Sequence, residues 1–390
     1  MTADEQAPAG LAICSACGRP VPDGAFCGAC GAHLGAGDDG AADRYRYHAF
    51  AANPAEHVLQ PSVISTLFPH LPHRRTAPFQ MAALLAGLFL LALGALRFTG
   101  PAIAAAALLV PLLYLLYLYE VEVYEDEPVT VLAATVGVGA LLGVGWALVS
   151  GPLITRSAVQ NLTVGATPNR ILIAGVLLPL AAQLVMLVGT LIVYTIRHFD
   201  EALDGFSFGA ASALGFTAAL TVVNLWPELR TSNVAQIPAL TSVTDVLQRG
   251  LLVPFINAGT TGLIAGALWL RRGEVRRLGG VGRAWVTSLP GAVVVAVVVD
   301  IVLGLSDTLA DNLAGALVVR LIVAAALLLA IRLAVHHMLL AEAVTTMVGA
   351  VEPCAHCHHI VPRMAFCPNC GVAIRATPKT GRGRTARAVR

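Results

Sequence analysis

The sequence predicts an all-α polytopic membrane protein of about eight transmembrane helices, with a small β-type ribbon at each terminus. Of its 390 residues, 57% are hydrophobic and 12% are charged, whereas a typical soluble domain has about 25% charged residues. The apolar residues form long runs, and a helix needs roughly 20 of them to cross a bilayer. All eight cysteines lie outside these runs, four near each end of the chain.

The cysteines predict a metal-binding ribbon at residues 11–34 and another at residues 351–374. Each ribbon has the spacing C-x2-C-x9-C-x2-C. Two C-x2-C pairs supply the four thiolates that a structural zinc ion requires, so we expect one Zn²⁺ in each ribbon. A redox pair would need one C-x2-C alone, and disulfides would need an oxidising compartment. The predicted ligands are Cys14, Cys17, Cys27 and Cys30 in the first ribbon and Cys354, Cys357, Cys367 and Cys370 in the second.

The two ribbons share Ala-Phe-Cys and a glycine after the last cysteine. They resemble the small zinc-ribbon family found at the ends of many bacterial membrane proteins. That resemblance implies a bacterial protein in which the ribbons bind a protein partner and do not catalyse. A ribbon of this size depends on its metal to fold. Whether the two ribbons pack together is open, although an even number of spans permits it.

The remaining chain divides into three parts. Residues 35–78 are predicted to be a linker and a juxtamembrane segment, and residues 79–340 to be the transmembrane domain. Residues 375–390 are predicted to be a disordered basic tail, which would be attracted to anionic lipid. The tail lacks aromatic residues, so we expect membrane lipid and not nucleic acid as its partner. The eight spans are predicted near 79–98, 100–119, 129–150, 171–196, 206–226, 250–270, 286–305 and 316–340.

The distribution of arginine predicts the orientation. Five arginines follow the sixth span, two precede the first, and the basic tail follows the last, all on one side of the membrane if the number of spans is even. Loops rich in Lys and Arg stay in the cytoplasm, and reduced thiols need that compartment. We therefore expect a multi-pass protein of the cell (inner) membrane with both termini in the cytoplasm.

Each of the last two predicted spans contains a charged residue near its outer end. Asp300 and Arg320 are predicted to lie at similar depth and to form an ion pair, because charges in the bilayer are usually paired. The simpler interpretation of this ion pair is that it holds the two helices together, and the alternative is that it belongs to a proton or ion path.

The transmembrane domain resembles the PrsW-type intramembrane metalloproteases over roughly residues 110–270. HFDEALDGFSFGAASALGFTAA at residues 198–219 is similar to the family's acidic loop that enters a Gly-rich helix ending in Gly-Phe. The acidic stretch at residues 119–128, the region of Pro179 and FINAGTTGLIAGALWL at residues 255–270 are also similar. The resemblance implies a helical zinc-protease fold.

The family's metal-site residues, however, have no counterparts here. The resemblance implies two adjacent glutamates and a lysine after a proline, a glutamate four residues after a phenylalanine, and a histidine four residues before a Thr or Asp. The matching positions hold Ala182, Gln183, Met186, Leu220 and Asn257. Zinc hydrolysis needs strong donors and a general base, so we predict no catalytic residues.

These observations favour a non-catalytic membrane scaffold or sensor whose cytoplasmic ribbons bind a protein partner. An active intramembrane zinc protease with displaced ligands is the alternative. A transporter is a weaker one, because no internal repeat is evident. The sequence does not identify the partner, a ligand of the membrane domain or the oligomeric state.

Overall fold

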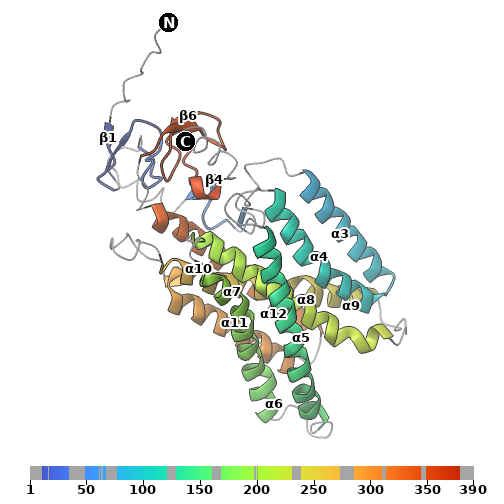
Figure 1. The fold of residues 1–390 in the computed structure, drawn as a ribbon. Helices are drawn as coiled ribbons and strands as arrows, with labels where there is room; N and C mark the ends of the chain where they lie inside the picture. Colours follow the sequence, from blue (N-terminus) through green and yellow to red (C-terminus); the bar gives the residue numbers. More distant parts are fainter. Residues whose placement is uncertain are drawn as a thin grey trace.

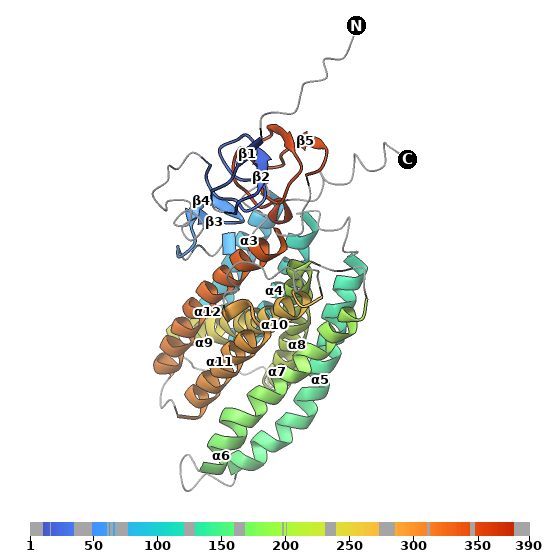
Figure 2. The ribbon, with the colours of Figure 1, turned by 90° about the vertical axis from the view of Figure 1, so that its left-hand side faces the viewer.

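The computed structural model is a helical bundle that carries a small β-rich unit at one end (Figure 1). Both terminal regions contribute to this unit, which lies at the same end of the bundle when the molecule is turned (Figure 2). The residues described are 11–15, 17–34, 49–60, 62, 65–66, 77–120, 129–159, 168–196, 199, 201–230, 239–272, 285–309, 313–343 and 348–377.

The bundle consists of long apolar helices. Eight helical spans in the described part of the chain are long and apolar enough to cross a membrane, which confirms the predicted fold class. Two spans are composite, since α6 continues through η3 into α7, and α9 continues through η4 into α10. The helices are α3 (Ala77–Ala95), α4 (Thr99–Glu120), α5 (Val129–Val159), α6 (Pro168–Leu172), η3 (Ile173–Leu177), α7 (Leu178–Tyr194), α8 (Ala202–Arg230), α9 (Ala239–Asp245), η4 (Val246–Leu252), α10 (Val253–Trp269), α11 (Leu289–Leu309) and α12 (Leu313–Glu342).

Helices α8 and α10 form the centre of the bundle. They are the most buried of the eight spans, and α3 is the least buried. Glycines let α5 approach α8 closely, since a β-carbon at Gly139 or Gly143 would overlap the carbonyl oxygen of Ser212 or Phe216. Small residues at a four-residue spacing are the usual device for close packing of membrane helices.

The composite spans contain π-helical turns, η3 and η4, each ending just before a proline. Pro179 and Pro254 are the second residues of α7 and α10. Proline has no N–H to donate to the preceding turn, and a π-bulge is a common way for a helix to accommodate such a lost hydrogen bond. The bulges precede Gln183 and Asn257 in chain order, so they help to set the direction in which these side chains point.

The β-rich unit contains three two-stranded antiparallel sheets. The first ribbon pairs β1 (Leu11–Ile13) with β2 (Pro20–Pro22), and the second pairs β5 (Val351–Pro353) with β6 (Ile360–Pro362) and ends in the short helix η8 (Ile374–Ala376). The third sheet pairs β3 (Ala49–Phe50) with β4 (Asn53–His57) inside the predicted linker. We call residues 11–34 and 348–377 the head, and residues 49–66 the docking segment.

The predicted ion pair between Asp300 and Arg320 is wrong. Arg320 instead forms an ion pair with Asp307 and donates to Gln248 Oε1 at 3.1 Å. The reason is the length of α11, which continues to Leu309 and leaves Asp300 nine residues from its end. Asp307 is 52% exposed, so the guanidinium reaches outward to a carboxylate that keeps part of its hydration. Asp300 Oδ2 has no partner among the described residues.

Candidate functional site

The four sulfur atoms of each ribbon converge on one point. In both quartets the ligand atoms lie within 4.8 Å of one another, and none of the eight cysteines forms a disulfide. The contacts Cys14–Cys30 and Cys17–Cys27 each measure 3.8 Å between Sγ atoms, and those of the second ribbon measure 3.8 and 3.9 Å. A tetrahedron with Zn–S bonds of about 2.3 Å has edges of about 3.8 Å. Each quartet therefore has the dimensions of a four-sulfur zinc site.

The electrostatics of the first quartet favour a thiolate. A hydrogen bond from the Cys30 thiol lowers the pKa of Cys27 to about 5. In the second ribbon, hydrogen bonds from Cys367 and Cys370 lower the pKa of Cys354 far below its usual range. The same hydrogen bonds raise the pKa of Cys30 and of Cys370. Because the thiolate is the form that binds metal, Cys27 and Cys354 are the thiols most readily available to an ion.

The backbone around the cysteines turns through left-handed residues. Gly31 and Gly371, the glycines after the last cysteines, have φ of 76° and 74°. Each donates its N–H to the carbonyl oxygen of the third cysteine of its ribbon. Gly18 has φ of 67° after the first knuckle, and the equivalent position in the second ribbon is His358 with φ of 60°. Glycine adopts this region at no steric cost, whereas histidine is strained in it.

The two ribbons pack against each other with an approximate twofold relation. Phe26 and Phe366 occupy equivalent positions, directly before the third cysteine of each ribbon. Phe26 N–H donates to the Pro368 carbonyl at 2.9 Å, and Phe366 N–H donates to the Gly28 carbonyl at 2.9 Å. The residues that flank Cys27 and Cys367 thus exchange main-chain hydrogen bonds. The head is one double ribbon, which brings both ends of the chain together.

A second set of residues converges inside the bundle, at the positions that the family resemblance singled out. Gln183 of α7 donates from Nε2 to Thr261 Oγ1 and accepts at Oε1 from Thr260 Oγ1, each at 3.1 Å. Asn257 of α10 donates to Thr217 Oγ1 of α8 at 2.9 Å. The amides and hydroxyls of three helices therefore satisfy one another. We call these five residues the neutral cluster.

The other matched positions are apolar and lie together beside α8. Met186 is buried with Phe216 in a hydrophobic core, and Ala182 and Leu220 pack against that core. Helices α7, α8 and α10 thus bring the matched positions together, as a metal centre shared between helices would require. Their side chains offer no carboxylate and no imidazole to an ion.

The two cysteine quartets are the groups that can hold a metal ion in the described part of the chain. These are the two places in that part of the chain where three or more His, Cys, Asp or Glu side chains bring their donor atoms together. Several acidic or histidine residues near the matched segments lie outside the described residues, among them Glu122, Glu125, Asp126, Glu127, His198 and Asp200.

The family model described as PrsW family intramembrane metalloprotease matches residues 127–331, more than half of the chain. The chain belongs to the PrsW family. No curated protein matches it, and no solved structure matches it. The PrsW match runs from just before α5 into α12 and includes α7, α8 and α10, so the neutral cluster lies inside it, whereas the head lies outside it.

Sequence reasoning missed the docking segment. Residues 35–78 were expected to form a linker and a juxtamembrane segment, but β3 and β4 fold into a hairpin that packs on the end of α12. Arg332 and His336, near the end of that predicted span, were the available signal, because a buried arginine needs acceptors. Most of the predicted juxtamembrane stretch, 61–79, and the tail after Thr377 lie outside the described residues.

Proposed function

We propose that this chain is a non-catalytic PrsW-family protein, a pseudoprotease, that works as a membrane scaffold or sensor. Its double zinc ribbon binds a protein partner in the cytoplasm, and its helical bundle anchors that head in the cell membrane of a bacterium. The observation that carries the proposal is the neutral cluster, in which Gln183 joins α7 to Thr260 and Thr261 of α10, and Asn257 joins α10 to Thr217 of α8.

The chemistry of the cluster supports the loss of catalysis. Hydrolysis by zinc requires an ion that activates water and a group that takes up the proton. Gln183 and Asn257 donate their amide N–H groups to threonine hydroxyls, and an amide has no pKa in the range of a general base. Hydrogen bonds of this kind hold membrane helices together at about 0.6 kcal/mol each. The cluster is suited to helix packing.

The chemistry of the head supports a scaffold role for the protein. Four-cysteine zinc sites are closed to substrate, because protein ligands fill every coordination position. The metal therefore stabilises the fold of each ribbon, and the ribbon surface remains for recognition. The arginine-rich loops and the need of the cysteines for a reducing compartment support a cytoplasmic location for the head.

The alternative is an active protease with displaced ligands, and membership of the PrsW family favours it. An active site would need donors elsewhere in the bundle. Asp204 is buried at the start of α8, but its Oδ2 accepts the N–H of Glu201 and acts as a helix-end cap. Outside the two cysteine quartets, no three His, Cys, Asp or Glu side chains of the described residues bring their donor atoms together.

The test is purification of the intact chain beside a variant with Cys27→Ser and Cys367→Ser. These changes remove one zinc ligand from each ribbon and leave every span unaltered. We expect a cytoplasmic protein to be retained by the intact chain and lost by the variant, while both insert into the membrane. Unaltered retention by the variant would contradict recognition through the head.

The same two preparations test catalysis. Both are mixed with membrane-tethered peptide substrates, with and without a zinc chelator. We expect no cleavage that the chelator abolishes. Chelator-sensitive cleavage by the variant, whose ribbons are disabled, would overturn the non-catalytic proposal and establish a metal inside the bundle.

A further inference from the structure

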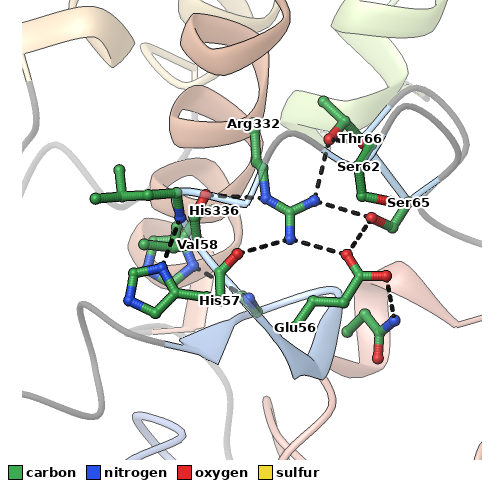
Figure 3. A network of polar contacts seen from close by, with 11 residues as sticks. Glu56, His57, Val58, Ser62, Ser65, Thr66, Arg332 and His336 are labelled. Carbon is green, nitrogen blue, oxygen red and sulfur yellow. Dashed lines mark hydrogen bonds and ion pairs between the residues drawn. The ribbon is translucent and has the colours of Figure 1, made fainter.

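Arg332 lies at the head end of α12 and is fully buried. Its guanidinium donates to five acceptors, all in the docking segment (Figure 3). An arginine has five N–H donors, and this set matches them in number. The acceptors are the carbonyl oxygens of His57 and Val58, the hydroxyls of Ser65 and Thr66, and the Glu56 carboxylate, at 2.8 to 3.1 Å.

The docking segment also covers the helix with an aromatic ring. Phe50 lies under the guanidinium, with Arg332 Cζ 4.0 Å from the ring centroid, and stacks on His336 at 6.3 Å between centroids. Ala51 N–H donates to His336 Nδ1 at 3.1 Å. Every acceptor that Arg332 uses is therefore brought to it by a segment that lies outside the bundle.

The head holds the docking segment in this place. Ala373, three residues after the zinc ligand Cys370, donates its N–H to the Ala51 carbonyl at 2.9 Å. Phe50, Phe366 and Ala373 belong to the hydrophobic core that also contains Ile331 and Val335 of α12. The main chain of Ala51 thus joins the second zinc knuckle to His336.

A second connection runs from the same ribbon to two helices. Arg375, five residues after Cys370, forms an ion pair with Glu342 at the end of α12 at 2.7 Å. Glu342 accepts the N–H of Ala202, the first residue of α8, at 2.6 Å. The carboxylate sits where the positive end of the α8 dipole lies. Arg375 also lies 3.9 Å from Glu201, directly before α8, so the ribbon contacts the ends of both helices.

We infer that the head is a zinc-dependent clasp, in which metal bound by the ribbons holds the docking segment on Arg332 and fixes the adjoining ends of α8 and α12. Small zinc ribbons lose their fold without metal. Loss of zinc then releases the knuckle, the docking segment follows, and Arg332 loses its acceptors. A buried arginine without acceptors is strongly unfavourable, so the end of α12 must rearrange or hydrate.

Coupling of this kind is reciprocal. If zinc stabilises the seated docking segment, the seated segment must strengthen zinc binding by the same factor. The inference rests on the zinc-loaded head of the proposed function and does not depend on the loss of catalysis. It gives the sensor a definite input, zinc availability, and a definite output, the conformation of the α8 and α12 ends.

The first measurement is hydrogen exchange of the full chain in a lipid nanodisc, with zinc bound and after chelation. We expect chelation to increase exchange in residues 49–60 and 336–343 as well as in the ribbons. Residues 314–325, at the opposite end of α12, serve as the internal control and should not change. Unaltered protection at 49–60 and 336–343 while the ribbons lose theirs would overturn the clasp and leave the zinc-binding head intact as a proposal. Absence of zinc from the starting protein would contradict the proposed function itself.

The second measurement is zinc affinity, by competition with a chelator. Arg332→Met should weaken zinc binding to the ribbons by at least about fivefold, at the low end of usual coupling. Arg320→Met is the matched control, since Arg320 is a buried arginine of the same helix whose partners, Asp307 and Gln248, lie away from the head. Its zinc affinity should equal that of the unaltered chain. If Arg332→Met fails to fold, Glu56→Gln, which removes the charge opposite Arg332, should give a smaller weakening. Equal affinities in all chains would refute the inference.

Discussion

Gly18 and Gly31 have nearly the same left-handed backbone conformation, with φ of 67° and 76°, but different surroundings. No heavy atom lies within 4 Å of a β-carbon built on Gly18, whereas one built on Gly31 would lie 3.0 Å from the Phe366 ring of the other ribbon. A substitution at Gly18 therefore tests only the backbone strain in the first ribbon. A substitution at Gly31 tests this strain together with the contact between the two ribbons.

Substitution of these glycines tests this difference. Gly18→Ala should cost about 1 kcal/mol from left-handed strain alone. Gly31→Ala should cost at least about 1 kcal/mol more, because the added methyl group overpacks the ribbon interface. Both losses of stability are measured as shifts in the denaturant concentration at which the full chain has released half of its zinc. Equal losses would mean that the ribbons do not pack as described.

The roles and partners of individual residues differed in how well they could be predicted from the sequence. The eight cysteines and their glycines were predictable, because metal-ligand spacing is local and specific. The partner of Arg320 was not, since it depended on where α11 ends. The acceptors of Arg332 lie more than 260 residues away in the chain, and no local pattern specifies such a contact.

At the scale of the element, helix packing depends on which glycines face a neighbour. Gly143 and Gly145 lie on α5, two residues apart. A β-carbon on Gly143 would overlap the main chain of α8, whereas one on Gly145 would meet nothing within 4 Å. The sequence predicted the spans, since their apolar runs are long, but it could not say which glycines are at the interface.

Leucine at these two positions tests the packing of α5 on α8. Gly143→Leu should separate the helices, lower the thermal midpoint in detergent and reduce the yield of monodisperse protein, because small residues allow this close approach. Gly145→Leu should leave both quantities unchanged. Comparable damage from both substitutions, or none from Gly143→Leu, would contradict the packing of these helices.

For the whole molecule, the central feature is that residues near the two ends of the chain form one head with two four-cysteine sites. We propose that this head sits on a bundle whose family metal site is occupied by neutral side chains. An even number of spans allowed the ends to meet, but the meeting itself depends on long-range contacts such as those of Phe26 and Phe366. The two amides of the neutral cluster, Gln183 and Asn257, were predictable from the family resemblance. Its mutual hydrogen bonds were not, because they depend on how α7 and α10 turn after their π-helical segments.

X-ray absorption at the zinc edge of the intact, purified chain tests this account most directly, because it reports both the amount of zinc and its ligands. We predict about two zinc ions per chain, all with four sulfur neighbours at about 2.3 Å. A third ion with nitrogen or oxygen neighbours, retained after all eight cysteines are changed to serine, would contradict the account and show a metal centre within the bundle.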